Sequence, residues 1–204
     1  MSKTGSTRPG TPLGDGTVFP SRQPDVIVRS RTASRVCDDD GIVPSYDRSD
    51  IRYHHYPVDT LVCTSVTPTC SADTVFNIML EESRFIAPSD DRNPVYDCKI
   101  TEVKINSITD IFFTSSVKST IDRRARRVTN FTLKGRHLLH PGRVTRTVVE
   151  TAGRVYVITE GVGTGFWPRG NELFAPPAWK EVDRLLQYRV HFPDLYNRYY
   201  PRRK

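Results

Sequence analysis

The chain has 204 residues, is 37% hydrophobic and 26% charged, and carries a formal net charge of +7. This length fits one ordinary domain with tails and is sufficient for a buried core. No apolar run approaches the roughly 18–20 residues of a membrane-spanning helix, and the N-terminus has no apolar signal region. We therefore expect a soluble cytoplasmic protein, although a protein exported without a leader would have the same features.

The first 50 residues are rich in Ser, Thr, Gly, Pro and Arg and show no sustained periodicity. Such a composition predicts a mostly disordered or extended N-terminal arm, residues 1–50. The four cysteines, at positions 37, 63, 70 and 98, form no CxxC pair and fit no common zinc spacing. We expect neither a metal nor a cofactor, and in a reducing compartment these cysteines are small buried apolar residues. A disulfide is expected only if the protein is exported.

The folded part is expected over residues 51–192. "DTLVCTSV" (59–66) is β-branched and apolar, which favours a strand. A helical pattern follows, with Ser71 as N-cap, Asp73 in the first turn and an end before Pro88. Its apolar positions are Val75, Phe76, Met79, Leu80 and Ile86.

Five strand-like segments come next, at 95–105, 108–117, 126–135, 142–151 and 154–162. Asn106-Ser107 and Ala152-Gly153 supply turns, and the second pair marks a hairpin because glycine tolerates the positive φ required there. In this hairpin Val144, Arg146, Val148 and Glu150 share one face, as do Val155, Val157 and Thr159, with Tyr156 and Ile158 opposite. A Gly-rich connection leads to a helix at 177–190, with Pro176 or Pro177 in its first turn. Residues 193–204 form a basic, aromatic tail.

This order predicts an α+β domain in which a curved antiparallel sheet of about six strands packs on a long C-terminal helix. "CTSVTPTCSADTVFNIM" and "APPAWKEVDRLL" resemble the first strand and helix, and the closing helix, of the START and polyketide-cyclase-like (helix-grip) superfamily, over roughly residues 59–190. The resemblance rests on element order, and a cone-shaped NTF2-type fold is the neighbouring alternative. It implies a cavity between the sheet and the last helix that takes an apolar ligand.

The first functional hypothesis is therefore a non-catalytic or weakly catalytic protein that binds an apolar small molecule or lipid. Burial of apolar ligand surface would supply most of the affinity, with a few polar groups for orientation. The candidate lining residues are Phe76, Leu80, Phe113, Phe131, Tyr156, Ile158, Trp167 and Trp179.

Basic residues are concentrated in 120–147 and at the C-terminus, which suggests a second hypothesis. Arginines interleaved with aromatic rings suit nucleic acid or an acidic protein partner. The candidate anion-binding residues are Arg123, Arg124, Arg126, Arg127, Arg202 and Arg203. An exposed, solvated hairpin tip explains the same cluster equally well.

A third hypothesis concerns "GRHLLHPGR" (135–143), where His137, His140 and Arg143 could act as acid, base and anion clamp in a small toxin-type hydrolase. Histidines three apart at a strand end fit neither the i, i+4 spacing of a helical metal site nor the i, i+2 spacing of a strand. A polar turn in which Leu138 and Leu139 pack inward is the alternative.

Overall fold

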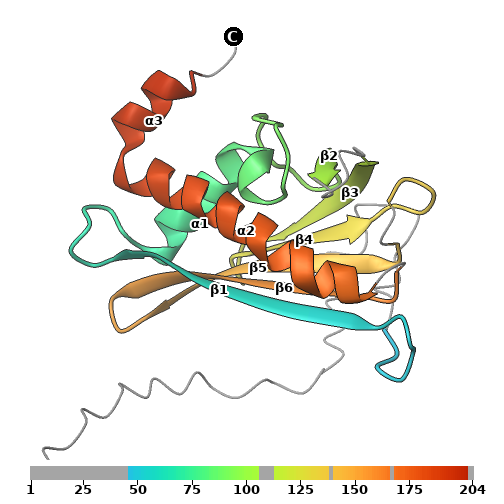
Figure 1. Ribbon diagram of the computed structural model, residues 1–204. Helices are drawn as coiled ribbons and strands as arrows, with labels where there is room; N and C mark the ends of the chain where they lie inside the picture. The colour runs from blue at the N-terminus through green and yellow to red at the C-terminus, as the bar shows by residue number, and fades with distance from the viewer. Residues whose placement is uncertain (1–45, 106–112, 138–139, 166–167, 202–204) are drawn as a thin grey trace, which may run out of the picture. The chain divides into compact units, whose positions relative to one another are not determined.

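The computed structural model describes residues 46–105, 113–137, 140–165 and 168–201 of the chain. Six antiparallel strands form one sheet in the order β1-β6-β5-β4-β3-β2, so that β1 and β2 are its edges (Figure 1). The strands are β1 (His54–Thr64), β2 (Ile100–Ile105), β3 (Phe113–Asp122), β4 (Arg127–Thr132), β5 (Gly142–Thr151) and β6 (Arg154–Gly163). All but the β1–β6 pairing join strands that follow one another in sequence.

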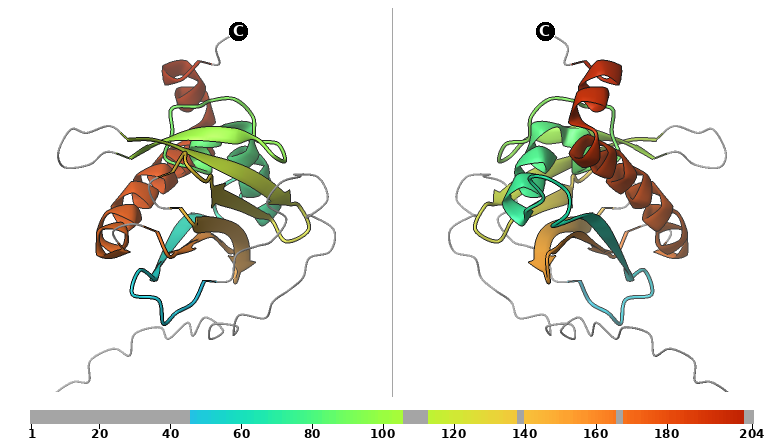
Figure 2. Two further views of the ribbon diagram at one scale, coloured as in Figure 1. Left: turned by 90° about the vertical axis from the view of Figure 1, so that its right-hand side faces the viewer. Right: turned by 90° about the vertical axis from the view of Figure 1, so that its left-hand side faces the viewer.

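The helices are α1 (Ala72–Glu81), the short 3₁₀ turn η1 (Ser83–Phe85), α2 (Pro168–His191) and α3 (Pro193–Tyr199). α2 contacts β1, and α1 contacts β5 and β6, so both helices cover the same face of the curled sheet (Figure 2). We call this covered side the concave face and the other side the outer face. The predicted α+β class, with an antiparallel sheet packed on a long C-terminal helix, is confirmed.

The β5–β6 hairpin is confirmed with its turn and its faces. Ala152 and Gly153 both have positive φ, at 48° and 69°, which is the backbone of a two-residue hairpin turn. Val148, Val155 and Val157 are buried on the concave face, as their alternation predicts.

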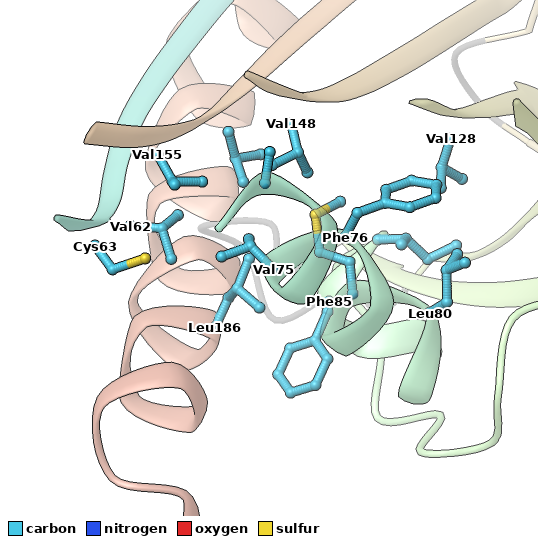
Figure 3. Close-up of a cluster of buried hydrophobic side chains, with 14 of the residues drawn as sticks. Val62, Cys63, Val75, Phe76, Leu80, Phe85, Val128, Val148, Val155 and Leu186 are labelled. Carbon is cyan, nitrogen blue, oxygen red and sulfur yellow. The ribbon is translucent and has the colours of Figure 1, made fainter. Parts of the chain in front are cut away.

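The main hydrophobic core lies between α1, the C-terminal half of α2 and the middle of the sheet. Figure 3 shows side chains from all three converging, among them Val62, Val75, Phe76, Val148 and Leu186. Ser71 caps α1 as predicted, because its hydroxyl accepts a hydrogen bond from Thr74 N at 3.1 Å. Deep burial of these apolar groups supplies the principal driving force for folding.

The predicted start of the last helix is wrong, since α2 begins at Pro168 and contains Pro176 and Pro177 in its interior. A proline within a helix removes the hydrogen bond to the carbonyl four residues earlier. Here those carbonyls belong to Glu172 and Leu173, which are exposed, so water can satisfy them. The Pro-Pro pair therefore interrupts backbone bonds on the solvent side without ending the helix.

Several predicted strand boundaries are shifted. β1 begins five residues before the predicted strand and includes the adjacent pair His54 and His55, while β2 begins only at Ile100. β3 runs on to Asp122, and the turn to β4 spans 123–126. The Asn106-Ser107 turn and the arm up to residue 45 lie outside the described residues.

Of the two alternatives for the cysteines, the structure has disulfides rather than small buried thiols. Cys63 and Cys70 form a disulfide that ties the end of β1 to the segment before α1, and Cys98 is disulfide-bonded as well. Both cysteines of the first bond border the main core, and Cys63 is buried. A pairing of this kind leaves no spacing signature in the sequence, because it depends on how the two elements meet.

The segment expected as a basic aromatic tail contains α3, which is anchored to the domain. Tyr196 is fully buried, and its hydroxyl donates to Glu82 Oε2 at 3.0 Å. Glu82 also accepts from Arg84 Nε at 2.6 Å, and Arg84 lies over the rings of Tyr196 and Tyr200. Among the described residues, no helix is long and apolar enough to cross a membrane.

Replacing Cys63 and Cys70 together with alanine is expected to lower the free energy of unfolding by about 2–3 kcal/mol. The bond closes a short loop, and opening it returns conformational entropy to the unfolded chain. Urea denaturation of the oxidised wild type and the double variant measures the difference. Equal midpoints would contradict a stabilising role for this bond.

Candidate functional site

The residues that face inward on the concave face differ between the two ends of the strands. Toward the β5–β6 turn, the inward positions are valines that join the main core. Toward the opposite end, the cross-strand rows hold small and polar residues: Tyr56, Gly161, Val144, Asn130 and Ser119 in one row, and His54, Gly163, Gly142, Thr132, Val117 and Thr101 in the next. The N-terminal half of α2 covers this part of the sheet near β1.

An ion pair stands at the boundary between these two regions. Arg146 on β5 bonds Asp183 on α2 at 2.5 Å, and both side chains are 0% exposed. Thr60 donates to the other carboxylate oxygen at 2.6 Å, and the second terminal nitrogen of Arg146 donates to Thr159 at 2.9 Å. Because two buried charges are stable only when closely paired and hydrogen-bonded, this network fixes α2 against the sheet.

Tyr56 and Trp179 lie beside the ion pair and link β1 to α2. Trp179 Nε1 donates to the Tyr56 hydroxyl at 3.1 Å, and the Arg146 guanidinium lies 5.0 Å from the Trp179 ring centre. Burial raises the pKa of Tyr56 to about 12, so its hydroxyl is protonated at neutral pH. The Tyr56 ring lies directly on Gly161, where a Cβ atom would come within 2.0 Å of it.

Three polar atoms of this face are buried without a hydrogen-bond partner among the described residues. They are Thr101 Oγ1 on β2, Ser115 Oγ on β3 and Nε of Arg146. Thr101 and Ser115 are each 1% exposed. A buried polar group without a partner costs about 1–3 kcal/mol, so such groups are rare unless water or a ligand completes them.

Thr101, Ser115 and Arg146, together with a second hydrophobic cluster, make up the candidate site. The cluster runs from β1 and α2 across to β2 and comprises Tyr56, Val58, Ala87, Val103, Val117, Trp179 and Val182, with Val144 and Ala175 packed against it. The arrangement offers apolar contact with a few hydrogen-bonding groups, which is the chemistry of a small-molecule site.

The structure separates the residues predicted to line a pocket. Trp179 lies in the candidate site, whereas Phe76 and Leu80 pack in the main core (Figure 3). Alternation along the strands places three others on the outer face: Phe131, Tyr156 and Ile158. The side chain of Phe113 and all of Trp167 lie outside the described residues.

His137 and His140 occupy the connection between β4 and β5. Burial, together with the charge of His140, lowers the pKa of His137 to about 4, so His137 is neutral at neutral pH. His140 Nδ1 lies 3.0 Å from the carbonyl oxygen of Thr132. Arg143 faces outward, and its guanidinium lies 5.7 Å from the Tyr46 ring centre. A neutral, poorly basic His137 does not favour acid–base catalysis here, and no cluster of three metal-ligating side chains occurs in the described part of the chain.

The basic cluster forms the β3–β4 hairpin tip. Arg123, Arg124 and Arg127 are exposed, whereas Arg126 pairs with Asp73 of α1 at 2.6 Å. Arg202 and Arg203 lie outside the described residues. Anion binding at this tip remains a prediction.

Sequence reasoning missed Arg146 and Asp183 as partners. The signal was present: Arg146 alternates with valines on the buried face of a strand, and Asp183 lies within the apolar stripe of Trp179, Val182 and Leu186. A charged residue at a core position requires an opposite charge nearby. The unpaired hydroxyls of Thr101 and Ser115 had no comparable signal.

The sheet order and the position of α2 settle the architecture. The chain has the helix-grip fold. The order of elements in the sequence suggested a resemblance to the helix-grip fold, and the structure confirms this resemblance at the level of the fold. No family model and no curated protein sequence matches the chain.

Solved structures with a similar course of the chain include the ZhuI aromatase/cyclase from Streptomyces sp. R1128, at 9% identity and TM-score 0.49, over 70% of this chain and 98% of that one. TTHA0849 from Thermus thermophilus matches at 7% identity and TM-score 0.49, over 70% and 99% of the two chains. Ara h 8.0201 matches at 10% identity and TM-score 0.40, over 66% and 97%.

Replacing Arg146 with methionine is expected to destabilise the protein by about 3–5 kcal/mol, because Asp183 is left buried without its partner. The double variant Arg146→Met with Asp183→Leu is expected to be more stable than either single variant, since no isolated charge remains. Urea denaturation of the three variants tests this coupling. Additive losses would show that the two charges are not coupled.

The stability of the protein is expected to fall as the pH drops from 6.5 toward 4. The pKa of His137 is about 4 in the folded protein and 6.5 in the unfolded chain. As the pH falls through this range, the unfolded chain takes up the proton before the folded protein does, so the free energy of unfolding decreases by about 3 kcal/mol. Urea midpoints at pH 7.5 and pH 4.5 measure the loss. His137→Gln should reduce it, whereas His55→Gln on the outer face should not.

Proposed function

We propose that this protein binds a small, largely apolar molecule between the concave face and the N-terminal half of α2. One observation carries the proposal: on this face the hydroxyls of Thr101 and Ser115 and the Nε of Arg146 are buried and lack a hydrogen-bond partner among the described residues. A purely structural interior would fill these positions with apolar side chains, because unpaired buried polar groups destabilise the fold.

The neighbouring residues support the same function. Valines from four strands and the Trp179 ring supply the apolar contact of the proposed site. Apolar contact contributes about 25 cal/mol for each Å² of ligand surface removed from water. The site thus combines a source of affinity with hydrogen-bonding groups that orient the ligand.

The disulfides support an oxidising compartment rather than the cytoplasm expected from the sequence. Cys63 and Cys70 are bonded to each other, and Cys98 is bonded too. Disulfides persist in secreted and periplasmic proteins and are rare in the reducing cytosol. We take residues 51–192 together with α3 as the ligand-binding domain.

The neutral dye N-phenyl-1-naphthylamine, which fluoresces in apolar surroundings, tests binding directly. We expect saturable binding to the full chain with a micromolar Kd, equivalent to about −8 kcal/mol. Val144→Phe adds bulk on the concave face and should weaken binding at least tenfold. Ala175→Phe, which adds similar bulk from α2, should do the same.

Ile158→Phe is the matched control, because it adds an aromatic ring on the outer face. It should leave the dye affinity unchanged, and circular dichroism should show that all three variants are folded. The absence of saturable binding to the wild type, or equal weakening by the concave and outer substitutions, would refute the proposed function.

A further inference from the structure

Thr101 and Ser115 form a pair of hydroxyls on the concave face near the β2 edge. Val117 lies opposite Thr101, and Val103 lies opposite Ser115, so the four side chains form a square of two hydroxyls and two valines. Residues at such diagonal positions have Cβ atoms roughly 7–8 Å apart or less. One small polar group can therefore approach both hydroxyls.

The nearby hydroxyl of Ser119 differs from these two. It donates to Asn130 Oδ1 at 2.8 Å, and Asn130 in turn donates to the carbonyl of Ile86 at 2.6 Å. The side chains of Ser119 and Asn130 are thus hydrogen-bonded within the protein. Within the described part of β2 and β3, Thr101 and Ser115 are the only residues whose hydroxyls are buried without a hydrogen-bond partner.

The charged groups around this face are already paired. Arg146 is balanced by Asp183, and Lys99 by Asp91 at 2.7 Å, with a further bond from Lys99 to Ser83 at 2.7 Å. Burial lowers the pKa of His54, which keeps that ring neutral at neutral pH. A charged ligand group placed here would be buried without an opposite charge, and that is strongly unfavourable.

We propose that Thr101 and Ser115 bind the uncharged hydroxyl or carbonyl group of an otherwise apolar ligand, and that the site discriminates against anions. This rests on the proposed function and specifies its ligand class. Either hydroxyl can donate to a carbonyl oxygen, and together they can both donate to and accept from a ligand hydroxyl. The apolar body of the ligand then lies along Val103, Val117 and Val144 toward Trp179.

Three probes that share one ring system test the ligand class: naphthalene, 1-naphthol and 1-naphthoate. The affinity of each is measured by displacement of N-phenyl-1-naphthylamine at pH 7. We expect 1-naphthol to bind about tenfold more tightly than naphthalene, as two modest hydrogen bonds allow. The anionic 1-naphthoate should bind at least tenfold more weakly than 1-naphthol.

The variant Thr101→Val with Ser115→Ala removes both hydroxyls with little change in shape. It should reduce the affinity for 1-naphthol to that for naphthalene, leave naphthalene within about twofold and not lower the Tm, because the lost groups have no partner in the fold. Ser119→Ala is the control: it should lower the Tm and leave the 1-naphthol preference intact.

The outcomes separate the two proposals. Dye binding without a 1-naphthol preference, a preference that survives in the double variant, or tighter binding of 1-naphthoate would overturn this inference and leave the proposed function standing. Failure of the dye itself to bind would overturn both.

Discussion

The ion pair between Arg146 and Asp183 is the constraint on which the arrangement of this domain depends. Both groups are fully buried, one on the sheet and one on α2, so neither finds a substitute partner in water if the helix shifts. Thr60 of β1 and Thr159 of β6 form further hydrogen bonds with the pair, and these bonds fix the orientation of the two charged groups. A shift of the helix would separate the two charges and leave each buried without its partner, so the pair opposes such a shift.

The position in which this ion pair holds α2 determines the contacts at both ends of the concave face. Toward α1, Leu186 reaches the main core and the valines of the β5–β6 hairpin (Figure 3). Toward the other end, Trp179 meets the Tyr56 hydroxyl, and the Tyr56 ring occupies the space that a side chain at position 161 would fill. Stability is thus concentrated at one end of the concave face, and the small polar surface lies at the other.

The sequence predicted the features that depend on local pattern. The β5–β6 hairpin follows from strict alternation and from a turn pair that accepts positive φ, and α1 follows from Ser71 and its apolar spacing. The start of α2 could not be found this way, because Pro-Pro within a helix is tolerated only where the released carbonyls face solvent. The disulfide and the Arg146–Asp183 pair join residues 7 and 37 apart, through contacts that exist only in the folded domain. The outer-face positions of Phe131, Tyr156 and Ile158 show that aromatic or apolar character alone does not identify the side of a sheet.

The placement of the unpaired hydroxyls is the observation on which the proposed binding surface depends. Thr101 and Ser115 sit between valines on the same face, and valine or alanine at those positions would remove the penalty of an unmet hydrogen bond at nearly constant volume. Ser119, further along β3 on the same face, pairs fully with Asn130. On β3 the fold satisfies the hydroxyl of Ser119 but not that of Ser115. The stability of the fold gives no reason for an unsatisfied hydroxyl at Ser115. The ligand proposed above would supply that reason, because its polar group would form the hydrogen bonds that the hydroxyls of Thr101 and Ser115 lack within the described part of the chain.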